Sequence, residues 1–371
     1  MKNTRKSIRA AAHMIAMGFI VGIWYLLPLQ VKADPAQALD PPKFEVDRFW
    51  PKPLPKQWVT GDLSGTCIDA QDHVFIVNRN VLTTKEQQVA EPAPPIIEFD
   101  TEGSVVNSWG DSDVLPKSLH GCTIDDQGNV WLAGSQDGIV QKYSHDGSKL
   151  LLQIGTRGQL DTSDGTITGA PMNSSHTMLN RPASIAIDPN NGDVYVGDGY
   201  GNRRVVVFDR EGHFLRQWGQ QGTVAQVEAG IGGVFLEHVH CVAIDNAGLV
   251  YVCDRKGDRI EVFDKMGNFQ KNIYIKKGTG KLTGIGSAWW IAFSRDRSQK
   301  YMYVADGGNE LIWTLDHATG QILSSFGRSG HQTGEFTYLH TISVDSKGNL
   351  IAGETIGGRR VQRFKRAGNE P

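Results

Sequence analysis

Cysteine is scarce in this chain, and four cysteines among 371 residues are too few to build a disulfide scaffold. A strong charge of either sign is also missing, because 38 basic and 40 acidic residues are mixed along the chain and leave a net charge of −2. This balance gives no reason to expect nucleic acid or anionic lipid as a partner. Cys241 and Cys253 face one short turn from opposite strands, and they are the first candidate disulfide pair.

The first 33 residues have the pattern of a secretory signal. Four basic residues within the first nine precede an uncharged, mostly apolar stretch over 10–30, and Val31-Lys32-Ala33 supplies small residues where a signal peptidase cleaves. We predict cleavage after Ala33 and export, to the periplasm or as a secreted protein, where disulfides can form. Because about 20 apolar residues can span a bilayer, the alternative is an uncleaved signal anchor, and only then would the protein meet a membrane.

A phrase made of apolar residues, an Asp, a polar turn and a β-branched or aromatic run recurs along the chain. Its six copies read CIDAQDHVFIV, TIDDQGNVWLA, IAIDPNNGDVYVGD, VAIDNAGLVYVCD, IAFSRDRSQKYMYVAD and ISVDSKGNLIAGE. Each copy is typical of two strands joined by a tight turn, and most copies are followed by a third strand and another turn, as in VVVFDREGHFLRQWG. Six units of four strands predict an all-β fold, a six-bladed β-propeller.

The end of the chain indicates how the ring closes. The sixth unit stops near the end of its third strand, in VQRFKRAG, which an open solenoid or a pair of β-sandwiches would leave unexplained. We predict that KFEVDRFW, residues 43–50, supplies the missing strand, because a closed ring has no free sheet edge. The predicted organisation is a signal over 1–33, a linker over 34–42 and the propeller over 43–371.

Histidine occupies one position in alternate repeats. The residues five places before the turn Asp of each unit, or before Ser294 in the fifth, are Ser64, His120, Ala183, His240, Trp289 and His340. The first strand of a propeller blade is innermost, and alternate blades of a six-membered ring stand about 120° apart. We therefore predict that the three histidines converge on the central channel and bind a zinc ion. Any one of them alone would be interpreted as an ordinary strand-end residue.

A second position lies ten residues after the same anchors, beside the first one across each hairpin. It holds Arg79 and Arg255, and Tyr200 adjoins it in the third unit. Taken singly, an arginine is usually an exposed surface residue. Together, these side chains would place two cations and a phenol around the predicted metal.

Further residues are predicted to form the wall of this site. His238 lies two residues before His240, outside the metal position, and is interpreted as a pocket-wall residue. Long insertions at 81–95, 156–180 and 219–236 are expected on the same face of the ring, where such scaffolds place binding sites. The alternative interpretation of the insertions is surface decoration.

The repeats resemble those of a known enzyme family. HGCTIDDQGNVWLAG, RPASIAIDPNNGDVYVGDGYGNRRVVVFD, HCVAIDNAGLVYVCDRKGDRIEVFD and LHTISVDSKGNL look like the NHL-type repeats of peptidyl-α-hydroxyglycine α-amidating lyase. The resemblance spans about residues 43–364, and the DGYGNR and DRKGDR phrases make it more specific than NHL repeats alone. It implies a six-bladed propeller with a zinc ion in the channel.

The resemblance selects the same six residues as the register. It implies zinc ligands at His120, His240 and His340, a catalytic tyrosine at Tyr200 and active-site arginines at Arg79 and Arg255. In this family an Asp that helps to hold a calcium ion usually follows the third zinc histidine, whereas Thr341 stands there in this chain, which leaves Ca²⁺ doubtful. The disulfide positions of the family do not match these cysteines.

The activity that the resemblance implies is that of a peptidylamidoglycolate lyase-like carbon–nitrogen lyase. It would split an N-(α-hydroxyalkyl) amide, such as a peptidyl-α-hydroxyglycine, into an amide and glyoxylate, with Tyr200 taking the hydroxyl proton and the arginines holding a substrate carboxylate. The alternatives are a related metallo-lyase or hydrolase acting on another hemiaminal, a hemiacetal or a lactone, and a non-catalytic binding platform. The expected partner is a small-molecule or peptide substrate with a carboxylate, and a monomer is expected.

Overall fold

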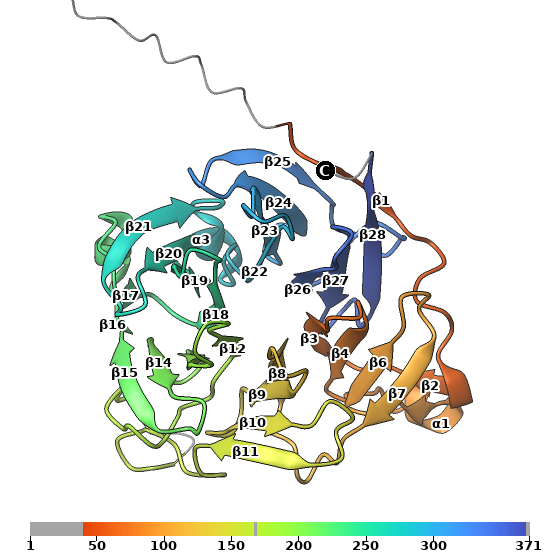
Figure 1. The fold of residues 1–371 in the computed structure, drawn as a ribbon, viewed down its shortest axis with the longest axis horizontal. Coiled ribbons are helices and arrows are strands. Elements are labelled where there is room, and N and C mark those ends of the chain that lie inside the picture. The colour runs from red at the N-terminus through yellow and green to blue at the C-terminus, as the bar shows by residue number, and fades with distance from the viewer. Residues whose placement is uncertain (1–39, 167–168, 369–371) are drawn as a thin grey trace, which may run out of the picture. The chain divides into compact units, whose positions relative to one another are not determined.

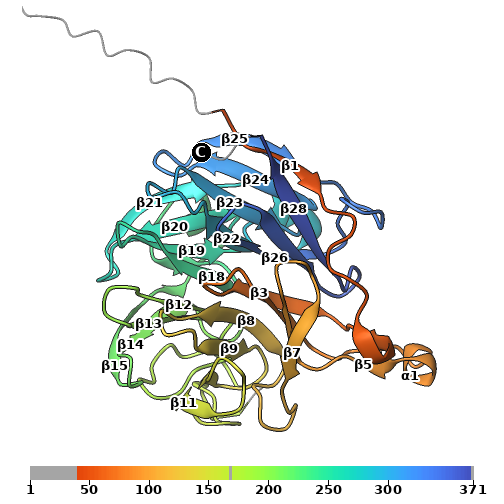
Figure 2. The same cartoon turned by 45° about the vertical axis from the view of Figure 1, so that its right-hand side comes forward.

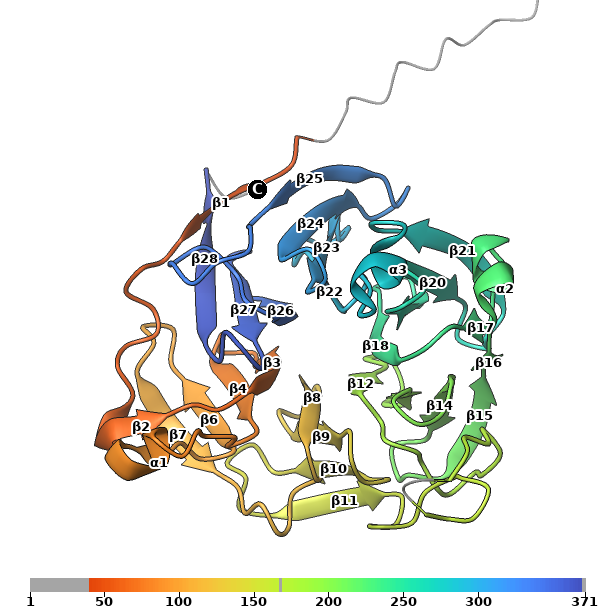
Figure 3. The same cartoon turned by 180° about the vertical axis from the view of Figure 1, so that it is seen from behind.

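The repeat phrases fold into a ring of six antiparallel four-stranded sheets, shown from its two sides in Figures 1 and 3. The computed structural model describes residues 40–166 and 169–368. The innermost strands of all six blades line a cavity of about 590 Å³ near their turn ends, which places the central channel inside the ring. The predicted six-bladed β-propeller is therefore confirmed.

Blades 1 to 6 follow the order of the chain, and within each blade the strands run from the innermost to the outermost. Blades 1 to 3 contain β3 (Leu63–Ile68), β4 (Val74–Asn78), β6 (Ile96–Phe99) and β7 (Val105–Trp109); β8 (Leu119–Ile124), β9 (Val130–Gly134), β10 (Val140–Tyr143) and β11 (Leu150–Ile154); and β12 (Ser184–Ile187), β13 (Val194–Asp198), β14 (Arg204–Phe208) and β15 (Phe214–Trp218). Blades 4 to 6 contain β18 (Val239–Ile244), β19 (Val250–Asp254), β20 (Arg259–Phe263) and β21 (Phe269–Tyr274); β22 (Trp290–Phe293), β23 (Tyr301–Asp306), β24 (Leu311–Asp316) and β25 (Ile322–Phe326); and β26 (Leu339–Val344), β27 (Leu350–Glu354), β28 (Val361–Ala367) and β1 (Lys43–Val46).

The ring closes through its first strand, as predicted. β1 pairs antiparallel with β28, with Lys43 opposite Ala367, and becomes the outermost strand of the sixth blade. In Figure 2, β1 lies along β28 although the two come from opposite ends of the propeller sequence. The sixth repeat supplies only three strands, and β1 is the fourth strand of the sixth blade.

The hydrophobic core lies between neighbouring blades. Along β4, Phe75 and Val77 pack toward blade 2, whereas Val74 and Ile76 pack toward blade 6. Successive side chains of a strand point to opposite faces, so each sheet supplies an apolar layer to both neighbours. This double burial is the reason why the strands read as nearly continuous apolar runs, and it fixes the inner strand ends that carry the candidate site.

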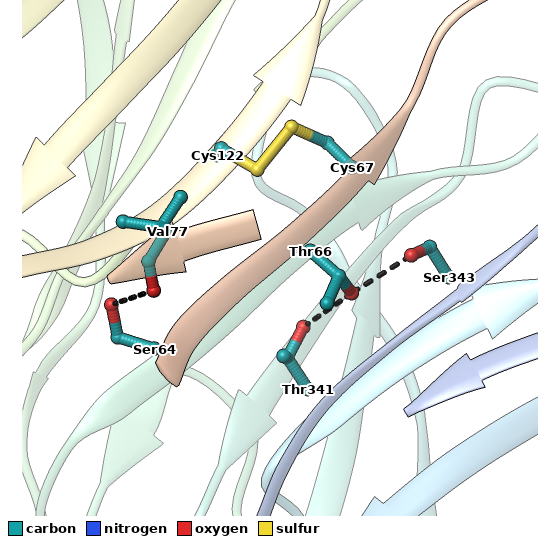
Figure 4. The surroundings of a disulfide bond; sticks show 7 residues. All are labelled: Ser64, Thr66, Cys67, Val77, Cys122, Thr341 and Ser343. Carbon is teal, nitrogen blue, oxygen red and sulfur yellow. Dashed lines mark hydrogen bonds between the residues drawn. A yellow bond between two sulfur atoms is a disulfide. The ribbon is translucent and has the colours of Figure 1, made fainter. Parts of the chain in front are cut away.

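Two disulfides connect inner strands. Cys241 and Cys253 are bonded across the hairpin of β18 and β19, with their Cα atoms 4.9 Å apart, as predicted. Cys67 and Cys122 form a second bond, which was not predicted and which joins the innermost strands of blades 1 and 2 (Figure 4). Since 55 residues separate this pair, the bond stabilises the fold by about 4 kcal/mol on loop-entropy grounds. Disulfides form in oxidising compartments, in agreement with the predicted export.

Two of the predicted insertions carry short elements of their own: α1 (Glu86–Val89) and β5 (Glu91–Pro92) lie in 81–95, and β16 (Gln220–Gln221), α2 (Val224–Glu228) and β17 (Val234–Phe235) lie in 219–236. The other additional elements lie outside the predicted insertions and are η1 (Pro55–Gln57), β2 (Trp58–Val59) and α3 (Thr279–Thr283). The predicted signal over 1–33 lies outside the described residues. Within the part of the chain that the structure describes, no helix has the length and hydropathy needed to cross a bilayer.

Candidate metal centre

The inner strands of blades 2, 4 and 6 are irregular at the histidine position. Their pairing with the second strand shifts register between Leu119 and Cys122, between Val239 and Val242, and between Leu339 and Thr341. A bulge of this kind leaves one residue out of the ladder and turns its side chain in a new direction. Blade 1 has the same shift between Leu63 and Gly65 but carries Ser64 there. The bulge thus sets the direction of the side chain, and the residue type decides whether that side chain can bind a metal.

The backbone before each histidine is also unusual. The residues two places earlier have positive φ angles: Ser118 (50°), His238 (63°) and Tyr338 (59°). Residues other than glycine adopt this left-handed conformation rarely, and such positions concentrate at functional sites because the surrounding structure must hold them. The three histidine strands therefore begin with the same locally strained turn, which blade 3 shares, because Arg181 before Ala183 has a φ of 61°.

The three imidazoles meet in the channel. The ring centroids of His120 and His240 are 4.8 Å apart, those of His120 and His340 are 4.7 Å apart, and those of His240 and His340 are 5.0 Å apart. One ring nitrogen from each lies within 4.8 Å of the other two, and all three residues are buried. The structure brings together the three histidines that the repeat register selected.

Backbone groups of the odd-numbered blades orient these imidazoles. His120 Nδ1 lies 2.8 Å from the carbonyl oxygen of Ala183, and His240 Nδ1 lies 2.7 Å from that of Trp289. A carbonyl only accepts, so each Nδ1 carries the proton and donates it. Burial lowers the pKa of His340, and the backbone of Ser64, at the equivalent place, opposes this lowering, although the contact falls short of full hydrogen-bond geometry. The even blades thus carry the imidazoles and the odd blades hold them.

This arrangement fits a divalent metal ion. A bond from Nδ1 to a carbonyl fixes the tautomer that offers Nε2 as ligand. Nε2 of His240 is buried and has no hydrogen-bond partner among the described residues. Burial lowers the pKa of all three histidines far below the usual value; Arg255 adds to this at His240, and Arg79 does so at His340. The imidazoles are therefore neutral at physiological pH, which is the form that binds zinc.

The predicted tyrosine and one predicted arginine border the imidazoles. The Tyr200 hydroxyl lies 3.0 Å from His120 Nε2, and Arg255 donates to the same hydroxyl oxygen from Nη1 over 3.3 Å. The Arg255 guanidinium lies 4.6 Å from the ring centroid of Trp289. A phenol, a cation and three imidazoles therefore lie side by side in a largely buried environment, where low dielectric strengthens their electrostatic interactions.

Arg79 reaches the same region from blade 1. Its Nε donates to the carbonyl of Leu119 over 2.7 Å, directly before His120. Burial lowers the pKa of Arg79, and the neighbouring Tyr200 and Asp62 oppose this effect. One of five guanidinium donors is used in this bond, which leaves donors for another partner.

The DGYGNR phrase forms the loop that carries the tyrosine. Nη1 of Arg203 donates to the carbonyl oxygens of Gly199, Gly201 and Asn202 over 3.1, 3.2 and 2.7 Å. One guanidinium therefore binds the backbone on both sides of Tyr200. The backbone N–H of Tyr200 donates to the carbonyl of Arg181 over 3.1 Å. The end of the insertion over 156–180 therefore lies beside the loop that carries Tyr200, on the face of the ring where the insertion was predicted.

Two aromatic neighbours complete the wall. The His238 ring lies 4.6 Å from that of Tyr200, in agreement with its predicted place in the wall. Trp289 was not selected from the sequence, yet its ring lies 5.4 Å from His240 and 5.6 Å from His340. It occupies the histidine position of the fifth blade, so the register itself was the signal that could have identified it.

Hydroxyl groups occupy the channel below the histidines. Thr66 of blade 1 accepts a hydrogen bond from Ser343 over 2.8 Å, and its hydroxyl lies 3.3 Å from that of Thr341 (Figure 4). Thr341 thus takes part in a neutral contact between blades 1 and 6. Calcium prefers carboxylate and carbonyl oxygens, and the prediction on Ca²⁺ stays a prediction.

Comparisons with known proteins agree on the repeat. Residues 179–208 match the NHL repeat family. Human NHL repeat-containing protein 3 is 23% identical over 336 residues, covering 86% of this chain and 84% of the human protein. Peptidyl-alpha-hydroxyglycine alpha-amidating lyase 2 of Drosophila melanogaster is 25% identical over 257 residues, covering 69% of this chain and 55% of the fly protein.

A solved structure supports the fold. The structure of streptogramin B lyase aligns with a TM-score of 0.53, 13% identity and coverage of 87% of this chain and 98% of the other. At this identity the likeness concerns the propeller fold alone. The relatives therefore include a lyase at about 25% identity, while the residues of the channel have to be judged by their own geometry.

Proposed function

We propose that this protein is a zinc-dependent carbon–nitrogen lyase that splits N-(α-hydroxyalkyl) amides, with a peptidyl-α-hydroxyglycine as the expected substrate and an amide and glyoxylate as products. The observation that carries the proposal is the buried set of three imidazoles with the Tyr200 hydroxyl 3.0 Å from one of them. The similarity to the amidating lyase of Drosophila melanogaster supports it. His120, His240 and His340 would hold the ion.

The proposed reaction needs a base at the substrate hydroxyl. A carbinolamide collapses when its hydroxyl loses a proton: the C–O bond becomes a carbonyl, the C–N bond breaks, and the amide nitrogen takes up a proton. When bound, zinc supplies a Lewis acid for the charge that develops on oxygen. Tyr200 takes the hydroxyl proton and returns it to the nitrogen. Arg255, 3.3 Å from the phenol oxygen, stabilises negative charge there by a charge-assisted hydrogen bond.

The two arginines give the proposed site its preference for an acid. Arg255 and Arg79 are cations within a mostly buried pocket, and burial strengthens their attraction for a carboxylate. An α-hydroxyglycine end carries its carboxylate one bond away from the carbon that bears the hydroxyl. A pocket that fixes this carboxylate also fixes the reacting carbon beside Tyr200, and such positioning is a large part of catalysis.

A direct assay tests the proposal. We expect the purified, zinc-loaded protein to release glyoxylate from a peptide that ends in α-hydroxyglycine, and to release none from the same peptide ending in glycine. Activity is expected to disappear with a chelator and to return with zinc. A zinc-loaded chain that releases no glyoxylate would contradict the substrate assignment and direct the search to other hemiaminals, hemiacetals and lactones. A chain that binds no zinc would favour the binding platform.

Replacing Arg255 by Gln is expected to raise KM for the free-acid substrate roughly 10- to 100-fold. This factor corresponds to the loss of one hydrogen bond to a charged group. The same variant should lose most of the preference for the acid over its methyl ester, and this ratio isolates carboxylate binding from the contact with Tyr200. The control is Lys256→Gln, which removes the adjacent cation, already paired with Glu237. An unchanged acid-to-ester ratio in Arg255→Gln would remove Arg255 from the carboxylate site.

A further inference from the structure

A second group of metal-ligating side chains lies at the turn end of the ring. Asp69, His73 and Glu98 come from blade 1, and His145 comes from the turn after β10 in blade 2. Asp69 follows β3 and lies five residues after Ser64, which is roughly 16 Å along a strand. The group is therefore separate from the three channel histidines.

The four side chains form a chain of contacts. His145 Nε2 lies 3.0 Å from Asp69 Oδ2, and His73 Nδ1 lies 2.7 Å from Glu98 Oε1 and 3.8 Å from Asp69 Oδ2. One donor atom each of Asp69, Glu98 and His145 lies within 4.8 Å of the other two. The side chains of Asp69 and Glu98 are only 2% and 5% exposed. One imidazole and two buried carboxylates thus face one small volume, and His73 lies beside Glu98.

The charges in this group are anomalous among the blades. In blade 2, the positions equivalent to Asp69 and Glu98 hold Asp125 and Lys142, which form an ion pair of 2.9 Å. Blade 1 places two acids at the same positions, and neither forms an ion pair with a lysine or arginine among the residues that the structure describes. Two carboxylates taken out of water repel each other unless a cation lies between them.

The position of His145 also indicates that a cation is missing from this group. In blade 4 the equivalent turn residue is Lys265, a permanent cation that pairs with Asp188 of the blade before it. In blade 2 an imidazole replaces the lysine, so this inter-blade contact has a metal ligand in place of a fixed positive charge. Asp69 is also held in place, because its Oδ1 accepts the backbone N–H groups of Gln71 and His73, both over 2.8 Å. Oδ2 is left for the cluster.

We propose that Asp69, Glu98 and His145 bind a second divalent transition-metal ion, with zinc as the expected occupant. One imidazole nitrogen and two carboxylate oxygens form a ligand set that zinc accepts, with water at the fourth position. The ion is structural: it ties blade 1 to blade 2 beside the Cys67–Cys122 bond. It also supplies the positive charge that Lys142 and Lys265 supply elsewhere in the ring.

Metal counting tests this second site independently of the channel. The tag-free protein is dialysed to equilibrium against zinc and analysed by plasma mass spectrometry. We expect two zinc ions per chain in the wild type, one in His240→Ala, and none when Glu98→Gln and His145→Gln are added to His240→Ala. In the wild-type background, Glu98→Gln with His145→Gln should retain one zinc ion and the lyase activity. If only the channel site fails to bind zinc, the wild type should still hold the ion of the second site. The zinc counts of the variants therefore show which of the two sites is occupied.

The matched control is His317→Gln in the His240→Ala background. His317 stands at the turn position equivalent to His145 and lies 3.2 Å from Asp245, but Val262 replaces the second acid there, so this variant should keep one zinc ion. Zinc should also raise the melting temperature of His240→Ala by several degrees, and that of the variant with Glu98→Gln added by much less. One zinc ion in the wild type and none in a folded His240→Ala would overturn the proposal and leave protonated histidines as the balancing charge.

Discussion

Replacing His240 by Ala is expected to abolish zinc binding in the channel and to lower glyoxylate release by roughly a thousandfold or more, because the Lewis acid that the proposed mechanism requires is worth several kcal/mol. His240 is one of the three proposed ligands, and its buried Nε2 has no hydrogen-bond partner among the described residues. Two remaining imidazoles do not form a closed ligand set. The measurement is zinc content together with the initial rate of glyoxylate release.

The control for this variant is His213→Ala. His213 is an exposed histidine that contacts Asp209 at 2.9 Å on the surface of blade 3, and its removal should change neither the channel zinc nor the rate. Circular dichroism should show the same sheet content in both variants, since the channel histidines contribute little to the core between the blades. Full activity in a His240→Ala protein that holds no channel zinc would contradict the metal role.

The sequence predicted those features that repeat within a blade. Each copy of the repeat aligns its strands and turns in the same register, so counting from the turn Asp was enough to place His120, His240 and His340 at one position on alternate blades. The same counting placed the closing strand, because a blade that lacks a strand must obtain one elsewhere. Periodicity is informative in this chain because each blade solves the same packing problem.

Features that join one blade to the next were not predicted. The Cys67–Cys122 bond and the contact between Asp69 and His145 both cross from blade 1 to blade 2, where the repeat gives no register. Trp289 was overlooked for another reason: its type differs from histidine, although it shares the histidine position. The bulges that turn the imidazoles inward also depend on the pairing of neighbouring strands, and a strand pattern alone does not place them.

The position of the tyrosine explains how three proposed ligands and a proposed base can share one channel. Odd blades carry no histidine at the inner position, and their backbone carbonyls hold the imidazoles of the even blades. Blade 3 therefore has no histidine at its inner position and places the loop with Tyr200 beside His120. Arg203 fixes this loop, because its Nη1 donates to three backbone carbonyls on either side of Tyr200.

From this follows the second large effect: Tyr200→Phe should lower kcat by about 10²- to 10⁴-fold, the usual contribution of a general base, while the channel keeps its zinc. Phenylalanine preserves the ring that contacts His238 and removes only the oxygen that lies 3.0 Å from His120 Nε2 and 3.3 Å from Arg255 Nη1. No ligand of the proposed ion is changed, so metal content and kcat should separate in this variant.

The matched control for Tyr200→Phe is Tyr195→Phe in the same blade. The Tyr195 hydroxyl accepts a hydrogen bond from Arg216 over 2.6 Å, away from the channel histidines, so its loss should affect stability more than rate. Because both variants lose one hydroxyl from blade 3, a fall in kcat confined to Tyr200→Phe would assign the effect to the position of the oxygen. An unchanged kcat in zinc-loaded Tyr200→Phe would instead require the hydroxyl proton to leave by another route, and Tyr200 would then only shape the pocket between His238 and Arg255.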